Sequence, residues 1–209
     1  MTSAALTDGD GAERRLQTAE FGMWVFLATE VLFFGGLFVA YGYGRLHHPD
    51  GWAAAARHTD VVLGTLNTAL LLTSSLFAAL AVAAAECGRA RWIGRLLGVT
   101  AALGVAFIVV KGIEWSHEGR DGLFPGPGFA LAGVPGAELF FIVYFLATGL
   151  HAVHLSLGVG LTATFAVGAA RGRAWAGPPR LQVAALYWHF VDAVWIFLYP
   201  LLYLVSRHA

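Results

Sequence analysis

Residues 186–205, LYWHFVDAVWIFLYPLLYLV, form one apolar run that carries two titratable side chains near its start. A run of about 20 apolar residues is long enough for one helix across a bilayer. His189 and Asp192 are three positions apart, so a helix would place them on one face. A soluble core helix, a metal or haem site, a proton path and a structural anchor would each explain such a pair. The stretch predicts an apolar environment and leaves the role of the pair open.

The composition of the whole chain favours lipid as part of that environment. Of the 209 residues, 58% are hydrophobic and 12% are charged, and the mean hydropathy is +0.67. Soluble domains have about 25% charged residues, so this chain has too few charges to cover a soluble surface. The formal net charge is zero, which gives no support for a nucleic-acid partner. Cys87 is the only cysteine, which excludes an internal disulfide framework and a cysteine-based metal cluster.

Five apolar stretches are each long enough to span a bilayer, at 21–43, 60–85, 93–113, 138–168 and 183–205. The fourth would be about 46 Å long at the helical rise, so we expect it to tilt or protrude. No stretch alternates apolar and polar residues with period two. The predicted fold class is therefore all-α, a polytopic membrane protein with a bundle of five transmembrane helices. We expect a cytoplasmic N-terminal segment at 1–20, too charged for a cleaved signal peptide, and one membrane domain at 21–206.

Basic residues near the predicted membrane ends indicate the orientation. Three segments share one side, namely the N-terminal segment, the turn after the second stretch and the connection after the fourth. Their arginines are Arg14, Arg15, Arg89, Arg91, Arg95, Arg171, Arg173 and Arg180. The opposite side has Arg45, Arg57, Lys111, Arg120 and Arg207. The excess of basic residues on the first side predicts a cytoplasmic N-terminus and an external C-terminus.

The two connections on the predicted external side are long. The first, HHPDGWAAAARHTD (47–60), has no ligand spacing typical of a metal motif, so we predict a solvated loop. The second, SHEGRDGLFPGPGFALAGVPG (116–136), is rich in Gly and Pro. This composition predicts a shaped connector rather than a helix.

Polar side chains inside the predicted spans are costly in a bilayer and therefore informative. Glu30 lies near the middle of the first stretch, where a short carboxylate cannot reach the interface. It must be either protonated or paired with a buried cation or donor. Lys111 and Glu114 are three apart near the end of the third stretch and predict a structural ion pair at the membrane boundary. Hydrogen bonds between helices are the prediction for the polar residues of the second stretch, which are Thr65, Asn67, Thr68, Ser74 and Ser75.

The fourth stretch contains LATGLHAVHLSLGVG (146–160), in which His151 and His154 are again three apart. Metal or haem ligation is one hypothesis for them, but haem-type His spacing and repeated Glu-x-x-His motifs are both missing. We therefore predict a hydrogen-bonded structural or lipid-contacting role. The available partners are Glu30, His189, Asp192 and the hydroxyls of the second stretch. Neighbouring glycines predict a close helix neighbour, and they are Gly149, Gly158 and Gly160.

Four quoted stretches together resemble subunit III of the haem–copper terminal oxidases. They are FGMWVFLATEVLFFGGLF (21–38), LNTALLLTSS (66–75), FFIVYFLATGLHAVHLSLG (140–158) and YWHFVDAVWIFLYPLLYLV (187–205). In that family, subunit III carries no haem or copper, flanks the catalytic subunit I, binds phospholipid in a cleft and helps to sustain proton uptake. The resemblance therefore implies a non-catalytic, cofactor-free component of an oxidoreductase complex, with haem and copper in partner subunits.

The resemblance also implies site residues and partners. Glu30 matches the buried carboxylate of the family that reacts with hydrophobic carbodiimides. The implied structural and lipid-contact cluster is Asn67, His151, His154, Trp188, His189 and Asp192, with no catalytic or metal-ligating residue. The implied partners are oxidase subunits I and II, with a small subunit IV as an optional addition, and phospholipids of a bacterial plasma membrane.

The resemblance leaves several alternatives open. The first two helices of the seven-helix members are missing, as in five-helix bacterial forms, so a partner subunit or lipid would fill their space. Either cytochrome c or quinol can be the electron donor of the complex. An accessory subunit of a nitric oxide reductase shares much of the pattern, and the metal centre of its partner would distinguish it. A stand-alone membrane enzyme or transporter that uses Glu30 and the His residues is a third hypothesis.

The resemblance favours a structural role for the pair in the opening stretch. In an accessory subunit, His189 and Asp192 would bond to each other or to the fourth stretch and so set the helix register. Tyr187 and Trp188 suit the aromatic belt at a membrane interface. Pro200 should bend the helix near its external end, where the missing hydrogen bond is most easily replaced.

Overall fold

The computed structural model describes residues 2–204, with the side chains of 17–173 and 175–204. Over this range the elements are α1 (Thr2–His47), α2 (Pro49–Ala56), α3 (Val61–Glu86), α4 (Ala90–Arg120), α5 (Ala137–Ala170), η1 (Ala174–Ala176), α6 (Pro178–Tyr199) and η2 (Pro200–Leu204). The all-α prediction is confirmed. Residue 206, the predicted end of the membrane domain, and Arg207 lie outside the described residues.

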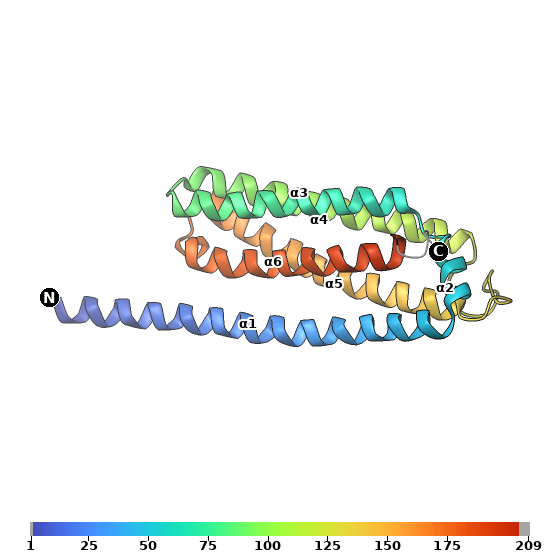
Figure 1. Ribbon diagram of the computed structural model, residues 1–209. Helices are drawn as coiled ribbons and strands as arrows, with labels where there is room; N and C mark the ends of the chain where they lie inside the picture. The colour runs from blue at the N-terminus through green and yellow to red at the C-terminus, as the bar shows by residue number, and fades with distance from the viewer. Residues whose placement is uncertain (1, 205–209) are drawn as a thin grey trace.

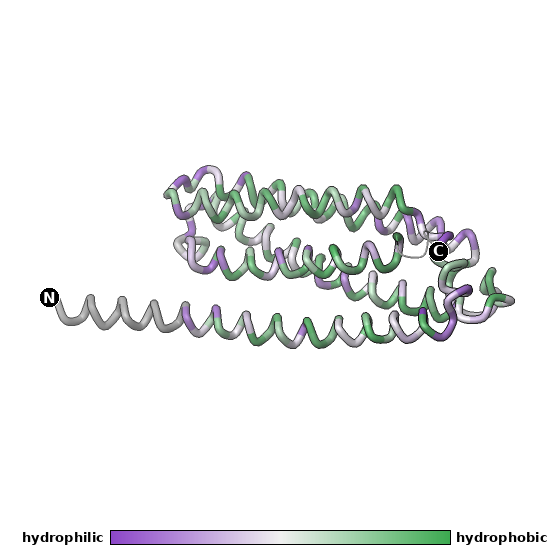
Figure 2. The backbone as a smooth tube through the Cα atoms, viewed as in Figure 1, coloured by the Kyte–Doolittle hydropathy of each residue, from purple (hydrophilic) through white to green (hydrophobic). Residues whose placement is uncertain are grey.

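Five helical segments are long and apolar enough to cross a membrane, which confirms the prediction of five spans. They are Gln17–His47, Val61–Glu86, Ala90–Arg120, Ala137–Ala170 and Pro178–Leu204. Figure 2 shows hydrophobic residues along the helices and hydrophilic residues gathered at the two ends of the molecule. This distribution fits a bilayer around the middle of the bundle.

Helices α3, α4, α5 and α6 form a four-helix bundle, and α1 packs on its outside against α5 and α6 (Figure 1). The start of α1, the α3–α4 turn and the α5–α6 connection lie at one end, called here the α3–α4 end. Helix α2, the connection 121–136 and η2 lie at the opposite end, called here the α2 end. The connections therefore lie at the ends of the bundle that the sequence predicts for them.

Helix α1 is attached to the bundle by one narrow stripe. Its buried large side chains are Leu27, Phe34 and Tyr41, which are seven residues apart and so lie on one face of a helix. In its most apolar 18-residue window 11% of the residues are buried, against 56% for Pro178–Leu204. Large apolar side chains such as Trp24 and Leu32 are exposed. An exposed apolar surface of this extent is a contact surface for lipid or another protein.

The ends of the bundle helices follow local sequence signals. Asp60 caps α3, because its Oδ1 accepts hydrogen bonds from the backbone N–H groups of Val62 at 2.9 Å and Leu63 at 3.1 Å. Beyond α3 and α5 the chain turns at Gly88 (φ +67°) and Gly172 (φ +64°). Glycine adopts this left-handed conformation without the steric cost of a side chain, so each helix stops where the next connection begins.

The predicted end of the third span at residue 113 is wrong, because α4 continues to Arg120. The extra residues include Glu114 and Glu118, which are both buried. Charged residues near the end of an apolar run normally indicate a loop in water. Here α5 and η2 supply hydrogen-bond partners for these carboxyl groups, so the helix continues into the protein interior.

The prediction of a solvated loop at 47–60 is also wrong in part, because residues 49–56 form helix α2. Trp52 is fully buried and packs edge-on against Tyr41 of α1 and Phe140 of α5. Pro49 and Asp50 in the first turn and four alanines favour a helix. The burial of Trp52 supplies the tertiary contact that a helix of eight residues needs. The second connection was predicted at 116–136, and this is wrong for residues 116–120, which belong to α4. Residues 121–136 have turns and no helix, as predicted.

Trp188 of α6 occupies a slot between two glycines of neighbouring helices. A Cβ atom built on Gly104 of α4 would lie 2.7 Å from the indole, and one on Gly158 of α5 would lie 3.1 Å from it. Trp188 is fully buried, and its Nε1 donates a hydrogen bond to Ser74 of α3 at 3.1 Å. One indole therefore contacts three helices, which confirms the predicted close approach at Gly158.

The same prediction fails at Gly160, where a Cβ would meet nothing within 4 Å. At Gly149 a Cβ would make an ordinary contact of 3.6 Å with Trp115. Glycine spacing alone does not identify which positions face a neighbouring helix. The slot for Trp188 determines that Gly158 is the close contact.

Gly104→Ala should lower the free energy of unfolding by about 1–3 kcal/mol, because the added methyl group would overlap the indole of Trp188 and the side chain of Val159. Gly98→Ala is the matched control, since a Cβ there meets nothing within 4 Å on the same helix. Thermal unfolding of the purified chain in detergent measures both. If both variants lost the same free energy of unfolding, the close packing of Trp188 against Gly104 would not be the cause.

Candidate functional site

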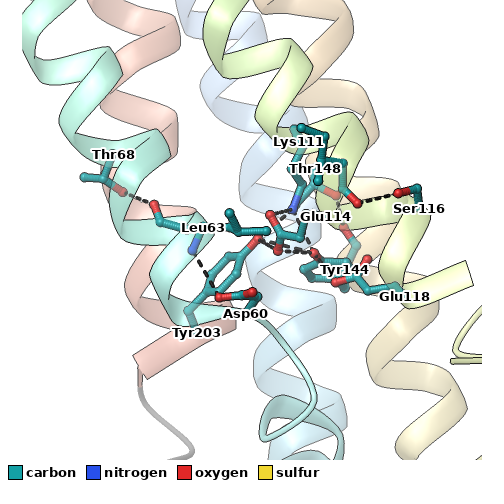
Figure 3. A network of polar contacts seen from close by, with 12 residues as sticks. Asp60, Leu63, Thr68, Lys111, Glu114, Ser116, Glu118, Tyr144, Thr148 and Tyr203 are labelled. Atoms are coloured by element: carbon teal, nitrogen blue, oxygen red, sulfur yellow. Dashed lines mark hydrogen bonds and ion pairs between the residues drawn. The ribbon is translucent and has the colours of Figure 1, made fainter. Parts of the chain in front are cut away.

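A buried polar cluster joins three elements at the α2 end, and we call it the terminal cluster (Figure 3). Its members are Lys111, Glu114 and Glu118 of α4, Tyr144 of α5 and Tyr203 of η2. None is more than 3% exposed. Charged side chains this deeply buried are rare unless they are paired and hydrogen-bonded, so the contacts within the cluster determine what it can do.

The Lys111 ammonium contacts three groups inside the cluster, two by hydrogen bonds and one by an ion pair. Its Nζ lies 2.7 Å from the hydroxyl of Tyr144 and 2.6 Å from that of Tyr203, and it forms an ion pair with Glu114 Oε2 at 3.2 Å. The predicted ion pair between Lys111 and Glu114 is present. It lies in the protein interior and connects to two tyrosines from other helices.

The two tyrosine hydroxyls in turn donate hydrogen bonds to the carboxylates. Tyr203 donates to Glu114 Oε1 at 2.6 Å. The single proton of the Tyr144 hydroxyl has two acceptors, Glu114 Oε1 at 2.8 Å and Glu118 Oε1 at 2.6 Å. Glu114 already accepts the hydrogen bond of Tyr203 and pairs with Lys111. We therefore assign the hydrogen bond donated by Tyr144 to Glu118. Glu118 Oε2 has no hydrogen-bond partner among the described residues.

Pro200 helps to bring Tyr203 into the cluster. Proline has no backbone N–H to continue the helical ladder, and α6 changes at Pro200 into the π-helical turn η2. The hydroxyl of Tyr41 in α1 donates a hydrogen bond to the backbone carbonyl of Leu201. The bend predicted at Pro200 is therefore a π-helical turn. This turn is hydrogen-bonded to α1 through Tyr41, and it places the Tyr203 hydroxyl next to Lys111.

A row of hydrogen bonds joins α3 to α6. The pairs are Thr65 with Tyr199 at 2.6 Å, Thr68 with Trp195 at 3.1 Å, Ser74 with Trp188 at 3.1 Å and Ser75 with His189 Nδ1 at 2.6 Å. The predicted bonds between helices are confirmed for these four residues. The expected partners of His189 were Asp192 or the fourth span, and the observed partner belongs to α3.

Several buried side chains have a polar atom without a hydrogen-bond partner in the described part of the chain. Both polar side-chain atoms are unpaired in Asn67 of α3, His151 of α5 and Asp192 of α6. The ring of His151 packs between Phe107 and Trp195, with centroid distances of 5.5 and 5.0 Å. These residues lie in the interior of the bundle and form no common site with His154.

His154 faces α1 and contacts Glu30. Its Nδ1 lies 2.8 Å from the backbone carbonyl of Leu150, and because a carbonyl only accepts, Nδ1 carries a proton. Its Nε2 lies 3.0 Å from Glu30 Oε2, without the alignment of a good hydrogen bond. One proton between these atoms gives either a neutral pair or an ion pair. The contact is partly exposed at the seam between α1 and α5.

The described residues contain no group of three or more His, Cys, Asp or Glu side chains that could hold a metal ion by themselves. Sequence reasoning missed Glu118, Tyr144 and Tyr203. Glu114 and Glu118 follow Lys111 at helical spacing, so the extended face could have been recognised from the sequence. The two tyrosines come from other elements, and the sequence contains no signal that they meet Lys111.

Comparisons with known proteins give a consistent result. Residues 2–207 match the family described as Cytochrome c oxidase subunit III. The chain is 29% identical over 200 residues to the cytochrome bo(3) ubiquinol oxidase subunit 3 of Pseudomonas aeruginosa, covering 95% of this chain and 90% of that protein. It is 30% identical over 198 residues to the cytochrome c oxidase subunit 3 of Corynebacterium diphtheriae, covering 93% and 92%.

A further relative has two subunits in one polypeptide. The chain is 32% identical over 194 residues to the heme-copper oxidase subunit I+III of Aeropyrum pernix. The match covers 88% of this chain and 22% of that longer protein. The similar region is therefore one part of a larger relative.

Lys111→Met should lower the free energy of unfolding by about 3–5 kcal/mol, because it leaves Glu114 and Glu118 buried without their cation. The double variant Lys111→Met/Glu114→Gln should recover most of that loss, since it removes a charge from each side of the pair. Unfolding of the three chains in detergent gives the coupling energy. Simple additivity of the two substitutions would contradict the pairing.

A hydrophobic carbodiimide should label Glu30, because the carboxyl is partly exposed on an apolar helix that a lipid-soluble reagent can reach. Glu30→Gln should abolish labelling. His154→Leu should raise the labelling rate several-fold, because the remaining carboxyl would be held protonated by its apolar surroundings. Mass spectrometry of the labelled peptide measures both. Unchanged labelling of Glu30→Gln would show that another carboxyl reacts.

Proposed function

Because this chain belongs to the cytochrome c oxidase subunit III family, we propose that it is the non-catalytic subunit III of a proton-pumping haem–copper oxidase of aerobic respiration. In this role it stabilises subunit I, binds lipid and supports proton uptake. The observation that carries the proposal is the family match along residues 2–207. Haem and copper belong to the partner subunits.

Contact with subunit I is supported by the relative from Aeropyrum pernix. That relative, a heme-copper oxidase subunit I+III, joins subunits I and III in one protein, and two parts of one polypeptide are held close together. We propose that the present chain makes the same association without a covalent link. Subunit II, with or without a small subunit IV, completes the complex.

Lipid binding is supported by the surface of α1. Most of its apolar window is exposed, including Trp24, Val31 and Leu32. The hydrocarbon of a bilayer covers such side chains at no desolvation cost. We propose that phospholipid or a partner subunit covers this exposed face of α1.

Support of proton uptake is the role proposed for Glu30 and His154. Their facing atoms lie 3.0 Å apart, and both side chains are partly exposed, so the pair is open to exchange with the surroundings. The remaining residues of the expected structural cluster, which are Asn67, His151, Trp188, His189 and Asp192, lie in or beside the interior of the bundle. We assign them to helix packing rather than to catalysis.

We propose a bacterial plasma membrane with the N-terminal segment 1–20 in the cytoplasm and the C-terminus outside. The basic residues of the α3–α4 end support this orientation. Lys111 is one of the basic residues predicted on the opposite side. Because it is buried and paired with Glu114, it adds no positive charge to a connection there. The boundary at residue 20 does not interrupt α1.

Purification of the tagged chain from its native membrane tests the function. A subunit I with haem and copper should co-purify, and the separated chain should carry no stoichiometric haem, copper or zinc. Copurification with a nitric oxide reductase would favour that alternative. Stoichiometric haem, copper or zinc together with enzymatic activity in the separated chain would favour a stand-alone enzyme and overturn the proposal.

Asp192→Ala should give a complex with a normal initial rate and normal haem spectra, but with activity that decays during turnover. The substitution empties the space of a buried side chain at the α3–α6 interface, at a cost of about 0.5–3 kcal/mol, and weakens retention of the subunit. Phe197→Ala is a suitable control, because Phe197 lies exposed on the same helix. Initial rate, decay rate and subunit content decide the outcome, and an abolished first turnover in a fully assembled complex would contradict the accessory role.

A further inference from the structure

A groove of about 250 Å³ lies between α3 and α4 at the α3–α4 end of the bundle. Leu80 and Cys87 line it from the end of α3, and their seven-residue separation gives a length of about 10 Å at the helical rise. The remaining lining residues are Ala83 and Ala84 of α3 and Arg89, Trp92 and Leu96 around the start of α4. The groove is therefore apolar toward the middle of the bundle and polar at the turn.

Positive charge gathers at the polar end of this groove. Arg89 lines the groove, and the guanidinium of Arg95 lies 5.7 Å from the ring centroid of Trp92, which forms a wall. The structure records no ion pair of Arg89 or Arg95 with any residue that it describes. Glu86, the acidic residue of this turn, accepts a hydrogen bond from Gln182 of α6 at 2.9 Å instead. Two guanidinium groups therefore lack an anion beside an apolar groove.

The dimensions of the groove and its charge indicate which occupant fits. A partner helix crosses a hydrocarbon core of about 30 Å, and a groove of two or three helical turns is too short to hold it. Inorganic phosphate would use the guanidinium groups and leave the apolar end uncovered. A phospholipid has an acyl chain for the apolar end and a phosphate for the arginines, which bind phosphate through charge-assisted hydrogen bonds.

The position of the groove suits a lipid at the bilayer surface. Trp92 and Leu80 are both exposed, and tryptophan is enriched at the level of the headgroups. Basic pockets between transmembrane helices on the cytoplasmic side bind anionic headgroups. A zwitterionic headgroup carries its own cation and would satisfy the two arginines less well, so the charge favours an anionic lipid.

We propose that the groove between α3 and α4 binds one anionic phospholipid, with the phosphate on Arg89 and Arg95 and part of an acyl chain along Leu80, Ala83 and Leu96. This site is separate from the exposed face of α1, because α1 packs against α5 and α6 on the other side of the bundle (Figure 1). It also differs from general lipid contact, since it selects for headgroup charge. The bound lipid fastens the α3–α4 turn to the membrane surface.

Cys87 provides a local measure of occupancy. It is the only cysteine of the chain, it is exposed, and it lines the groove. Alkylation of the purified full chain in detergent by a water-soluble maleimide should slow several-fold when dioleoylphosphatidylglycerol is added. Dioleoylphosphatidylcholine and inorganic phosphate should leave the rate nearly unchanged. Equal slowing by both lipids, or slowing by phosphate alone, would overturn the proposal.

Arginine variants separate the groove from the general positive charge of this end. Each variant is compared with and without lipid, so that a change in the intrinsic reactivity of the thiol cancels. Arg89→Gln should lose most of the protection by dioleoylphosphatidylglycerol. Arg91→Gln is the matched control, because Arg91 is exposed in the same turn, has the same charge and does not line the groove. Equal protection in the two variants, whether kept or lost, would contradict the site.

Ala83→Leu tests the acyl-chain part of the groove. Ala83 is exposed on α3, so the chain should fold normally while the larger side chain fills the apolar end. Protection of Cys87 by the anionic lipid should fall several-fold, although all the arginines remain. Full protection in this variant would show binding of the headgroup alone and overturn the proposal. The separate chain is used, so the result does not depend on an oxidase partner.

Discussion

Polar groups inside a membrane-spanning bundle must find their partners within the protein, because lipid offers none. This constraint explains most of the specific contacts of the molecule. Hydroxyl groups of α3 meet Trp and His side chains of α6 in a row of hydrogen bonds. At the α2 end, Lys111 is satisfied by Glu114 and two tyrosines. The second oxygens of Glu114 and Glu118 have no hydrogen-bond partner among the described residues, although that of Glu114 lies 3.2 Å from Lys111 Nζ.

Packing and polar contacts reinforce each other at Trp188. Its indole fits between Gly104 and Gly158 only because neither has a side chain, and its N–H reaches Ser74. The aromatic ring thus holds three helices at close distance while its polar atom is satisfied. Van der Waals contact and hydrogen bonds between helices are the interactions that associate helices in lipid.

Helix α1 differs from the bundle in its degree of attachment. One stripe of residues and the contact of Glu30 with His154 join it to α5 and α6, and most of its apolar surface is free for lipid or a partner. The rigid bundle and the exposed helix suit different tasks. We infer that α3–α6 maintain the shape of the subunit, whereas α1 makes its external contacts.

The sequence by itself determined the fold class, five spans, the sharing of sides by the connections and the family, because apolar length and composition decide whether a segment lies in lipid. It also indicated the polar positions that need partners, such as Glu30 and Ser75. Only the tertiary structure decided which residues pair with them. Glu30 contacts His154 rather than His151, and His189 forms a hydrogen bond with Ser75. The helical end of α4, the burial of Trp52 and the meeting of Tyr144 and Tyr203 at Lys111 were likewise decided there. Each depends on residues far apart in the chain, and helical periodicity contains no information about which face of one helix meets another.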